Sequence, residues 1–196
     1  MRVAPRCDLW DVGLETATRS PPAPGTAGGI RHSVFIDGEG RLSSCGSAAT
    51  EGEGGEEEEE KFSGLLGHGE GVTRLNTPTR HPSTLGDERA VSVSAGRNHS
   101  LALTAGGAVW SWGDGDYGQL GHGDTQRQLL PKKIEAFAGQ RVVAVSAGSS
   151  QSIAITADGA VFTWGKGEDG CLGHGEDLSN QLLPKKIEAW APEAGR

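Results

Sequence analysis

Apolar and polar residues alternate over several short stretches of the chain. Residues 143–147 read Val-Ala-Val-Ser-Ala, residues 152–156 read Ser-Ile-Ala-Ile-Thr, and residues 160–164 read Ala-Val-Phe-Thr-Trp. A period of two residues with β-branched and aromatic side chains predicts β-strands. The last two stretches are joined through Asp158-Gly159. This dipeptide favours a tight hairpin, because such a turn needs positive φ angles.

The pattern recurs, which indicates a repeat protein. The octapeptide Leu-Leu-Pro-Lys-Lys-Ile-Glu-Ala occurs at residues 129–136 and again at residues 182–189. Trp112-Gly113 recurs as Trp164-Gly165, 52 residues further on. A degraded earlier copy has Cys45-Gly46 at the Trp-Gly position. Repeats of this length form solenoids, propellers or arrays, in which each unit buries its apolar faces against its neighbours.

Each full repeat is expected to hold four short strands, with Pro-Lys-Lys-Ile-Glu-Ala at residues 131–136 as the fourth strand of one copy. Ala102 stands between Leu101 and Leu103, a pattern that suits a sheet buried on both faces. The predicted fold is therefore all-β, a partial β-propeller of about three four-stranded blades. We expect the tryptophans of the Trp-Gly pairs to fill the inter-blade core and to donate their indole N–H groups to loop carbonyls.

The repeats divide the chain into five regions. An acidic Gly-Glu insertion interrupts the first copy, and its charge predicts that it loops out into solvent. The expected regions are a disordered segment at 1–27, a degenerate first repeat at 28–80 with the insertion at 47–63, a second repeat at 88–140, a third repeat at 141–189, and a tail at 190–196.

The repeat motif Ala-Gly-x-x-His-Ser-Leu-Ala-Leu-Thr-x-x-Gly-x-Val-x-x-Trp-Gly, followed by Gly-Gln-Leu-Gly-His-Gly, resembles that of the regulator of chromosome condensation family over residues 28–189. Residues 109–118 are similar to the propeller domains of large HECT-type ubiquitin ligases. The resemblance implies a seven-bladed propeller with about 50 residues per blade. Three repeats are fewer than that. We therefore expect a fragment of a longer propeller, an incomplete gene product, or a chain that completes itself by self-association.

Composition and charge narrow the function classes. The net charge is −8, and nucleic-acid binding needs clustered basic residues, so nucleic acid is an unlikely partner. The three cysteines form no CxxC pair, which argues against a zinc module. No apolar run approaches the ~18 residues of a membrane span. We expect a cytoplasmic or nuclear protein with no membrane contact.

Three motifs suggest chemistry, and each has a structural explanation. Gly113 and Gly165 each begin a GxGxxG sequence, but no helical pattern follows as dinucleotide binding requires. The recurring Gly-His-Gly triplets are expected to fix loops by hydrogen bonds. His99 precedes Ser100, and adjacent strand residues point to opposite faces, so this histidine cannot activate that serine. We predict no catalytic residue, no metal site and no cofactor.

The predicted function is a non-enzymatic module for protein–protein interaction. Loop positions that vary between copies are the expected contacts, because variation on a fixed scaffold provides specificity. The alternative is a regulatory piece, either a guanine-nucleotide exchange factor for a small GTPase or the substrate-recruiting part of a HECT-type ubiquitin ligase. The candidate partner-binding residues are Arg97, Asn98, Asp114, Asp116, Tyr117, Ser149, Ser150, Lys166, Glu168 and Asp169.

Overall fold

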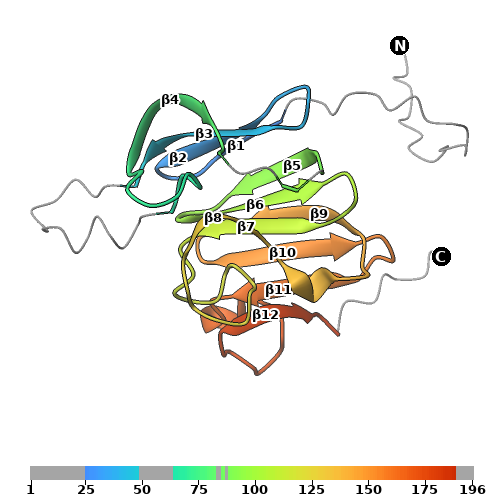
Figure 1. Ribbon diagram of the computed structural model, residues 1–196. Coiled ribbons are helices and arrows are strands. Elements are labelled where there is room, and N and C mark those ends of the chain that lie inside the picture. The colour runs from blue at the N-terminus through green and yellow to red at the C-terminus, as the bar shows by residue number, and fades with distance from the viewer. Residues whose placement is uncertain (1–24, 49–63, 83–84, 87, 189–196) are drawn as a thin grey trace, which may run out of the picture.

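The computed structural model describes residues 25–48, 64–82, 85–86 and 88–188. These residues form three four-stranded antiparallel sheets (Figure 1), which confirms the predicted all-β fold with three propeller blades. Residues 1–24 of the expected disordered segment, residues 49–63 of the expected insertion and the expected tail lie outside the described residues.

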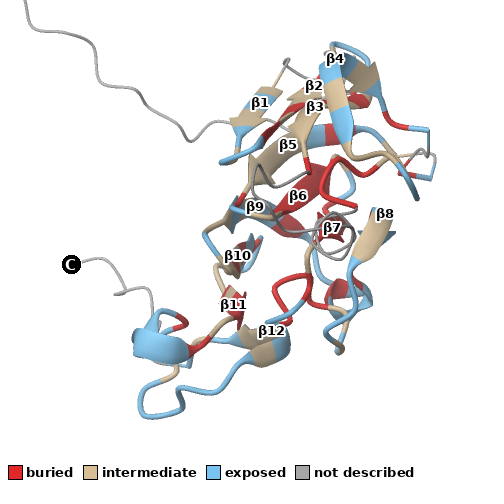
Figure 2. Cartoon of the chain, turned by 90° about the vertical axis from the view of Figure 1, so that its left-hand side faces the viewer, coloured by how far each residue is buried: buried red, intermediate tan, exposed pale blue. Residues whose placement is uncertain are grey.

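Each blade is a meander in which every strand pairs with the next one along the chain. The first strands of neighbouring blades contact each other, and the sheets stack one after another (Figures 1 and 2). The first blade comprises β1 (Gly25–Gly28), β2 (His32–Ile36), β3 (Leu42–Ser47) and β4 (Arg74–Arg80); the second comprises β5 (Ala90–Ala95), β6 (His99–Thr104), β7 (Val109–Gly113) and β8 (Gln128–Lys133); the third comprises β9 (Val142–Ala147), β10 (Gln151–Thr156), β11 (Val161–Gly165) and β12 (Gln181–Lys186).

Two strand boundaries differ from those expected. The first blade begins at Gly25, within the segment expected to be disordered, because β1 pairs with β2 along its whole length. The fourth strand of the second blade is β8, which ends at Lys133 instead of continuing to residue 136. A 3-10 turn over Glu135–Phe137 follows and buries Phe137. Pro131 lies inside β8, which a sheet tolerates because β8 is an edge strand.

Alternate residues of the second blade pack in opposite directions, as the sequence predicted. Leu101 and Leu103 belong to the core shared with the third blade, whereas Ala102 belongs to the core shared with the first. Every residue of β6 is buried, as Figure 2 shows. The middle blade therefore has no solvent-facing sheet surface at this strand, and it is stabilised from both sides.

The two Trp-Gly tryptophans are fully buried at successive interfaces. Trp164 donates its indole N–H to the carbonyl oxygen of Gln119 over 2.9 Å, as expected. The same expectation is wrong for Trp112, whose indole nitrogen has no hydrogen-bond partner in the described part of the chain. The ring of Trp112 packs edge-on against His81 at a centroid distance of 5.3 Å. The interface between the first and second blades therefore leaves a buried indole N–H without a partner among the described residues, whereas the matching group between the second and third blades is paired.

Replacing Trp164 with alanine should lower the free energy of unfolding by about 3–5 kcal/mol, because the change leaves a cavity and removes the hydrogen bond to Gln119. Urea denaturation followed by circular dichroism would measure this. Val143 lies in the same blade and is half exposed, so Val143→Ala should change the free energy by no more than about 0.5 kcal/mol. Equal losses in both variants would contradict the packing described.

Candidate protein-binding cleft

Loops of the second and third blades approach closely at one end of the strands. Gly96, in the turn between β5 and β6, lies so near the next blade that an added Cβ atom would stand 2.3 Å from the carbonyl oxygen of Gly148. The amide of Arg97 donates to that same oxygen over 3.3 Å. The two turns are therefore held together by backbone contact, and only glycine fits at position 96.

A histidine–serine hydrogen bond joins neighbouring blades just beneath these turns. His99 Nε2 lies 2.9 Å from Ser152 Oγ, and that hydroxyl donates to the carbonyl oxygen of Gln119 over 2.8 Å. His99 must therefore donate its Nε2–H to the serine. Burial lowers the pKa of His99 to about 3, so the ring is neutral at physiological pH. The first interface repeats the contact between His32 and Ser100 at 2.7 Å.

This geometry argues against nucleophilic catalysis. Each histidine contacts the serine of the next blade and not its own neighbour in sequence. The Nδ1 atoms of His32 and His99 have no hydrogen-bond partner among the described residues, whereas a catalytic base needs a group that orients it. The contacts serve to bind one blade to the next.

The Gly-His-Gly histidines fix loops, as the sequence predicted. His122 Nε2 lies 2.9 Å from Ser111 Oγ, which donates to the carbonyl oxygen of Leu120. His174 repeats this arrangement with Thr163; His68 does so with Ser44. Among the described residues, no three His, Cys, Asp or Glu side chains gather closely enough to bind a metal ion.

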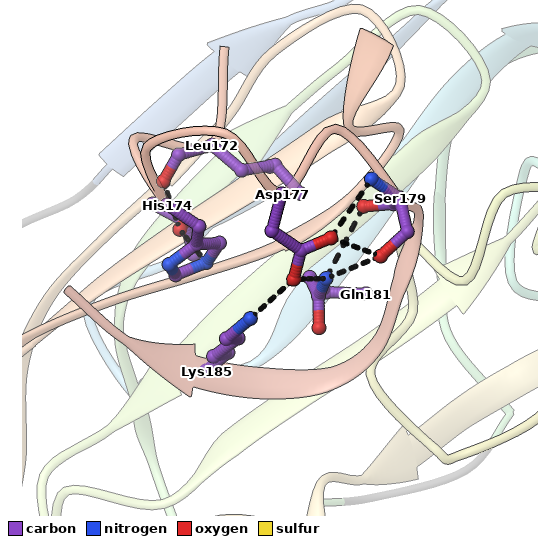
Figure 3. A network of polar contacts seen from close by, with 7 residues as sticks. Leu172, His174, Asp177, Ser179, Gln181 and Lys185 are labelled. Carbon is purple, nitrogen blue, oxygen red and sulfur yellow. Dashed lines mark hydrogen bonds and ion pairs between the residues drawn. The ribbon is translucent and has the colours of Figure 1, made fainter. Parts of the chain in front are cut away.

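The long connection between β11 and β12 is fixed by a second polar network (Figure 3). Asp177 accepts hydrogen bonds from Ser179 N at 3.1 Å, Gln181 Nε2 at 3.2 Å and Lys185 Nζ at 2.6 Å. The hydrogen bond from Lys185, and then those from Ser179, hold the pKa of the Asp177 carboxyl well below its usual range. The carboxylate stays ionised and anchors the loop to β12.

A cleft of about 460 Å³ opens between the loops of the second and third blades. The structure brings all ten candidate partner-binding residues together on its walls. Two further residues line it, Gln151 and Cys171. Sequence comparison of the copies could have found both, since Gln151 stands where the second copy has His99 and Cys171 where it has Gln119.

Side chains on the second-blade wall are held in place. Asp114 accepts hydrogen bonds from the amide of Asp116 and from the side chain of Gln119, both over 3.2 Å. The Gln119 side-chain oxygen accepts the amide of Tyr117 over 2.9 Å. Because each bond lies within the loop, its shape does not depend on a bound partner.

The two walls meet at an ionic and aromatic contact. Lys166 Nζ lies 2.7 Å from a Glu168 carboxylate oxygen and 5.2 Å from the centre of the Tyr117 ring. The hydrogen bond to Glu168 raises the pKa of Lys166. Asp169, at φ 61°, is the one non-glycine residue with positive φ in the described part of the chain. Two basic and four acidic side chains line the cleft, so its lining is acidic.

The meander blades, their stacking and the loop cleft define a protein of the β-propeller class. A sequence profile described as the regulator of chromosome condensation (RCC1) repeat matches residues 62–103, 106–155 and 158–191. The chain belongs to this repeat family, as its motifs predicted. Residues 25–48 lie outside the match, yet they supply three strands of the first blade.

The relatives that this chain matches are much longer than it is. The chain is 38% identical to human E3 ubiquitin-protein ligase HERC2 over 82% of its own length and 3% of that protein. It is 41% identical to the Arabidopsis thaliana ultraviolet-B receptor UVR8 over 66% of its length and 29% of the receptor. It thus spans well under half of either relative.

Solved structures show the same fold. Human WBSCR16 matches with a TM-score of 0.68 and 27% identity, over 82% of this chain and 38% of that one. Prp20p of Saccharomyces cerevisiae matches with a TM-score of 0.68 and 24% identity, over 83% and 37% of the two chains.

The described part of the chain contains no helix with the length and hydrophobicity of a membrane span.

The free energy of unfolding should fall as the pH drops from about 6.5 to about 4. The folded-state pKa of His99 is depressed from 6.5 to about 3, so in this range the unfolded chain binds a proton that the folded chain does not. His99→Gln, which copies the third blade, should reduce the slope by up to about 1.4 kcal/mol per pH unit. Urea denaturation at several pH values would measure it, and an unchanged slope would contradict the assignment.

Proposed function

We propose that this chain is a non-enzymatic module that binds a protein partner in the cleft between its second and third blades. The supporting observation is the arrangement of variable positions. Ten loop residues that differ between the two copies line one cleft, while β8 and β12 are identical in sequence and the other strands differ mostly by conservative exchanges such as Leu to Ile. A scaffold that is constant while one concave surface varies is typical of repeat proteins that recognise partners.

The chemistry of the cleft indicates what the partner offers. Its lining carries more carboxylates than basic groups, so a segment with lysine or arginine side chains is electrostatically complementary. Tyr117 is 36% exposed at the rim, and tyrosine is enriched among the residues that dominate interface energies. The hydrogen bonds within the Asp114 loop reduce the ordering cost of binding. We infer that the partner presents a basic segment.

Peptides selected from a random library on the full chain should be basic, and their affinity should fall at least about tenfold in the variant Asp116→Lys/Tyr117→Ala/Glu168→Lys. Reversing the charge at positions 116 and 168 repels a basic peptide, and removing the Tyr117 ring removes an aromatic contact, so both changes lower the affinity. Fluorescence anisotropy would measure the dissociation constants.

The matched control changes charge at the opposite end of the strands. Glu135→Lys/Gln140→Lys alters two exposed residues between β8 and β9, and it should leave the affinity unchanged. If this control loses as much affinity as the cleft variant, or if the selected peptides are acidic, the proposed cleft is wrong.

Similarity to HERC2 favours a second, more specific candidate, in which the chain recruits a substrate for a ubiquitin ligase. A partner captured by the cleft would then carry more ubiquitin in cells that express the chain than in cells that express the cleft variant. Mass spectrometry of ubiquitin-modified lysines would measure this. Equal modification would support partner binding but not substrate recruitment for a ligase. Accelerated nucleotide release from a small GTPase would identify an exchange factor instead.

A further inference from the structure

The first blade departs from its repeat at a buried position. Ile134 follows β8, is 1% exposed, and donates its amide to the carbonyl oxygen of Val109. In the third blade, Ile187 makes the same bond to Val161. The amide of His81 donates in the same way to Leu42 over 3.0 Å. A histidine therefore occupies a place that the other two copies fill with isoleucine.

His81 is poorly explained as a packing residue. It is 7% exposed, and neither ring nitrogen has a hydrogen-bond partner in the described part of the chain. Its ring lies between His68, at a centroid distance of 4.7 Å, and Trp112. Buried polar atoms without partners reduce stability, and in native proteins they commonly indicate a ligand, a water or a function.

His81 lines a cavity of about 160 Å³ between the first and second blades. The cavity is formed by the turn between β2 and β3, the end of β4 and residues that precede β5, so it lies at the end of the strands opposite the binding cleft. Liquid water occupies roughly 30 Å³ per molecule. The cavity therefore has room for a compact group of several non-hydrogen atoms.

The charges around this cavity are unequally paired. Glu39 forms an ion pair with Arg41, and Glu88 accepts a hydrogen bond from Thr104. Arg80 and Arg89 also line the cavity, and neither forms a salt bridge with another described residue. The described lining residues thus include three arginines and two glutamates, so the cavity carries an excess of positive charge.

The equivalent cavity between the second and third blades keeps the two basic positions but has no histidine. It is lined by Lys133, Ile134 and Arg141, at the positions of Arg80, His81 and Arg89. Ala108 stands there in place of Arg41. The scaffold alone therefore does not require a histidine or the additional arginine at this end of the strands.

We propose that the cavity between the first and second blades binds a compact oxyanion, a carboxylate or a phosphate group, through the guanidinium groups of Arg80 and Arg89 and a ring N–H of His81. Guanidinium groups match the geometry of both oxyanions and can bind them with two parallel hydrogen bonds. Burial, reinforced by the neighbouring His68, lowers the pKa of His81 to about 3. Its ring is neutral at pH 7 and offers one N–H donor. This site is separate from the proposed partner-binding cleft.

Thermal unfolding of the full chain with sodium phosphate, sodium acetate or sodium chloride at equal ionic strength tests this proposal. We expect a saturable rise in melting temperature with phosphate, acetate or both, and none with chloride, because a ligand that binds only the folded state stabilises it. A response to phosphate alone identifies a phosphoryl group, and a response to acetate alone identifies a carboxylate. A response to neither overturns the proposal.

Variants separate binding from packing. His81→Ile installs the residue of the other two copies, so it should raise the melting temperature without ligand and abolish the anion response. Arg89→Ala should weaken the response at least tenfold in half-saturating concentration. Arg141→Ala removes the matching arginine of the neighbouring cavity and should retain the full response. An unchanged response in both His81→Ile and Arg89→Ala would place the anion elsewhere and overturn the assignment.

Discussion

Gln119 connects the interface between two blades to the cleft above it. Its carbonyl oxygen accepts the indole N–H of Trp164 and the hydroxyl of Ser152, both from the third blade. Its side chain holds Asp114 and the amide of Tyr117 in the second. Because one buried residue makes all four bonds, the packing of the blades and the shape of the Asp114 loop depend on each other. Loss of Trp164 should therefore disturb the cleft as well as the core.

The burial of each blade face depends on whether a neighbouring blade packs against it. Leu103, on the second blade, is 3% exposed beneath the third, whereas Ile155 at the matching position of the third blade is 38% exposed. On the opposite side, the first blade carries Cys45 where the later copies have fully buried tryptophans. The two end faces thus differ in chemistry, one rich in branched apolar side chains and the other with a small side chain at the tryptophan position.

Much of this arrangement could be predicted from the sequence, because strand alternation and the 52-residue offset place equivalent residues in equivalent environments. The convergence of the ten variable loop residues follows from that reasoning, since turns at the same strand end must meet. The start of β1 at Gly25 could not be predicted, because Gly-Thr-Ala-Gly has no apolar alternation. β1 forms because its backbone pairs with β2, and not because its side chains favour a strand.

The cavity around His81 was inaccessible to sequence reasoning for a different reason. Its lining comes from three separate segments of the chain, and the insertion in the first copy hides the correspondence between His81 and Ile134. Only the shared backbone hydrogen bonds, from His81 to Leu42 and from Ile134 to Val109, establish it. We propose function at the positions where one copy departs from the others without improving its own packing. The cleft shows such departures at one end of the strands, where they cost little because the loops are exposed. His81 shows one in a buried place, where a polar atom without a partner lowers stability and isoleucine would not.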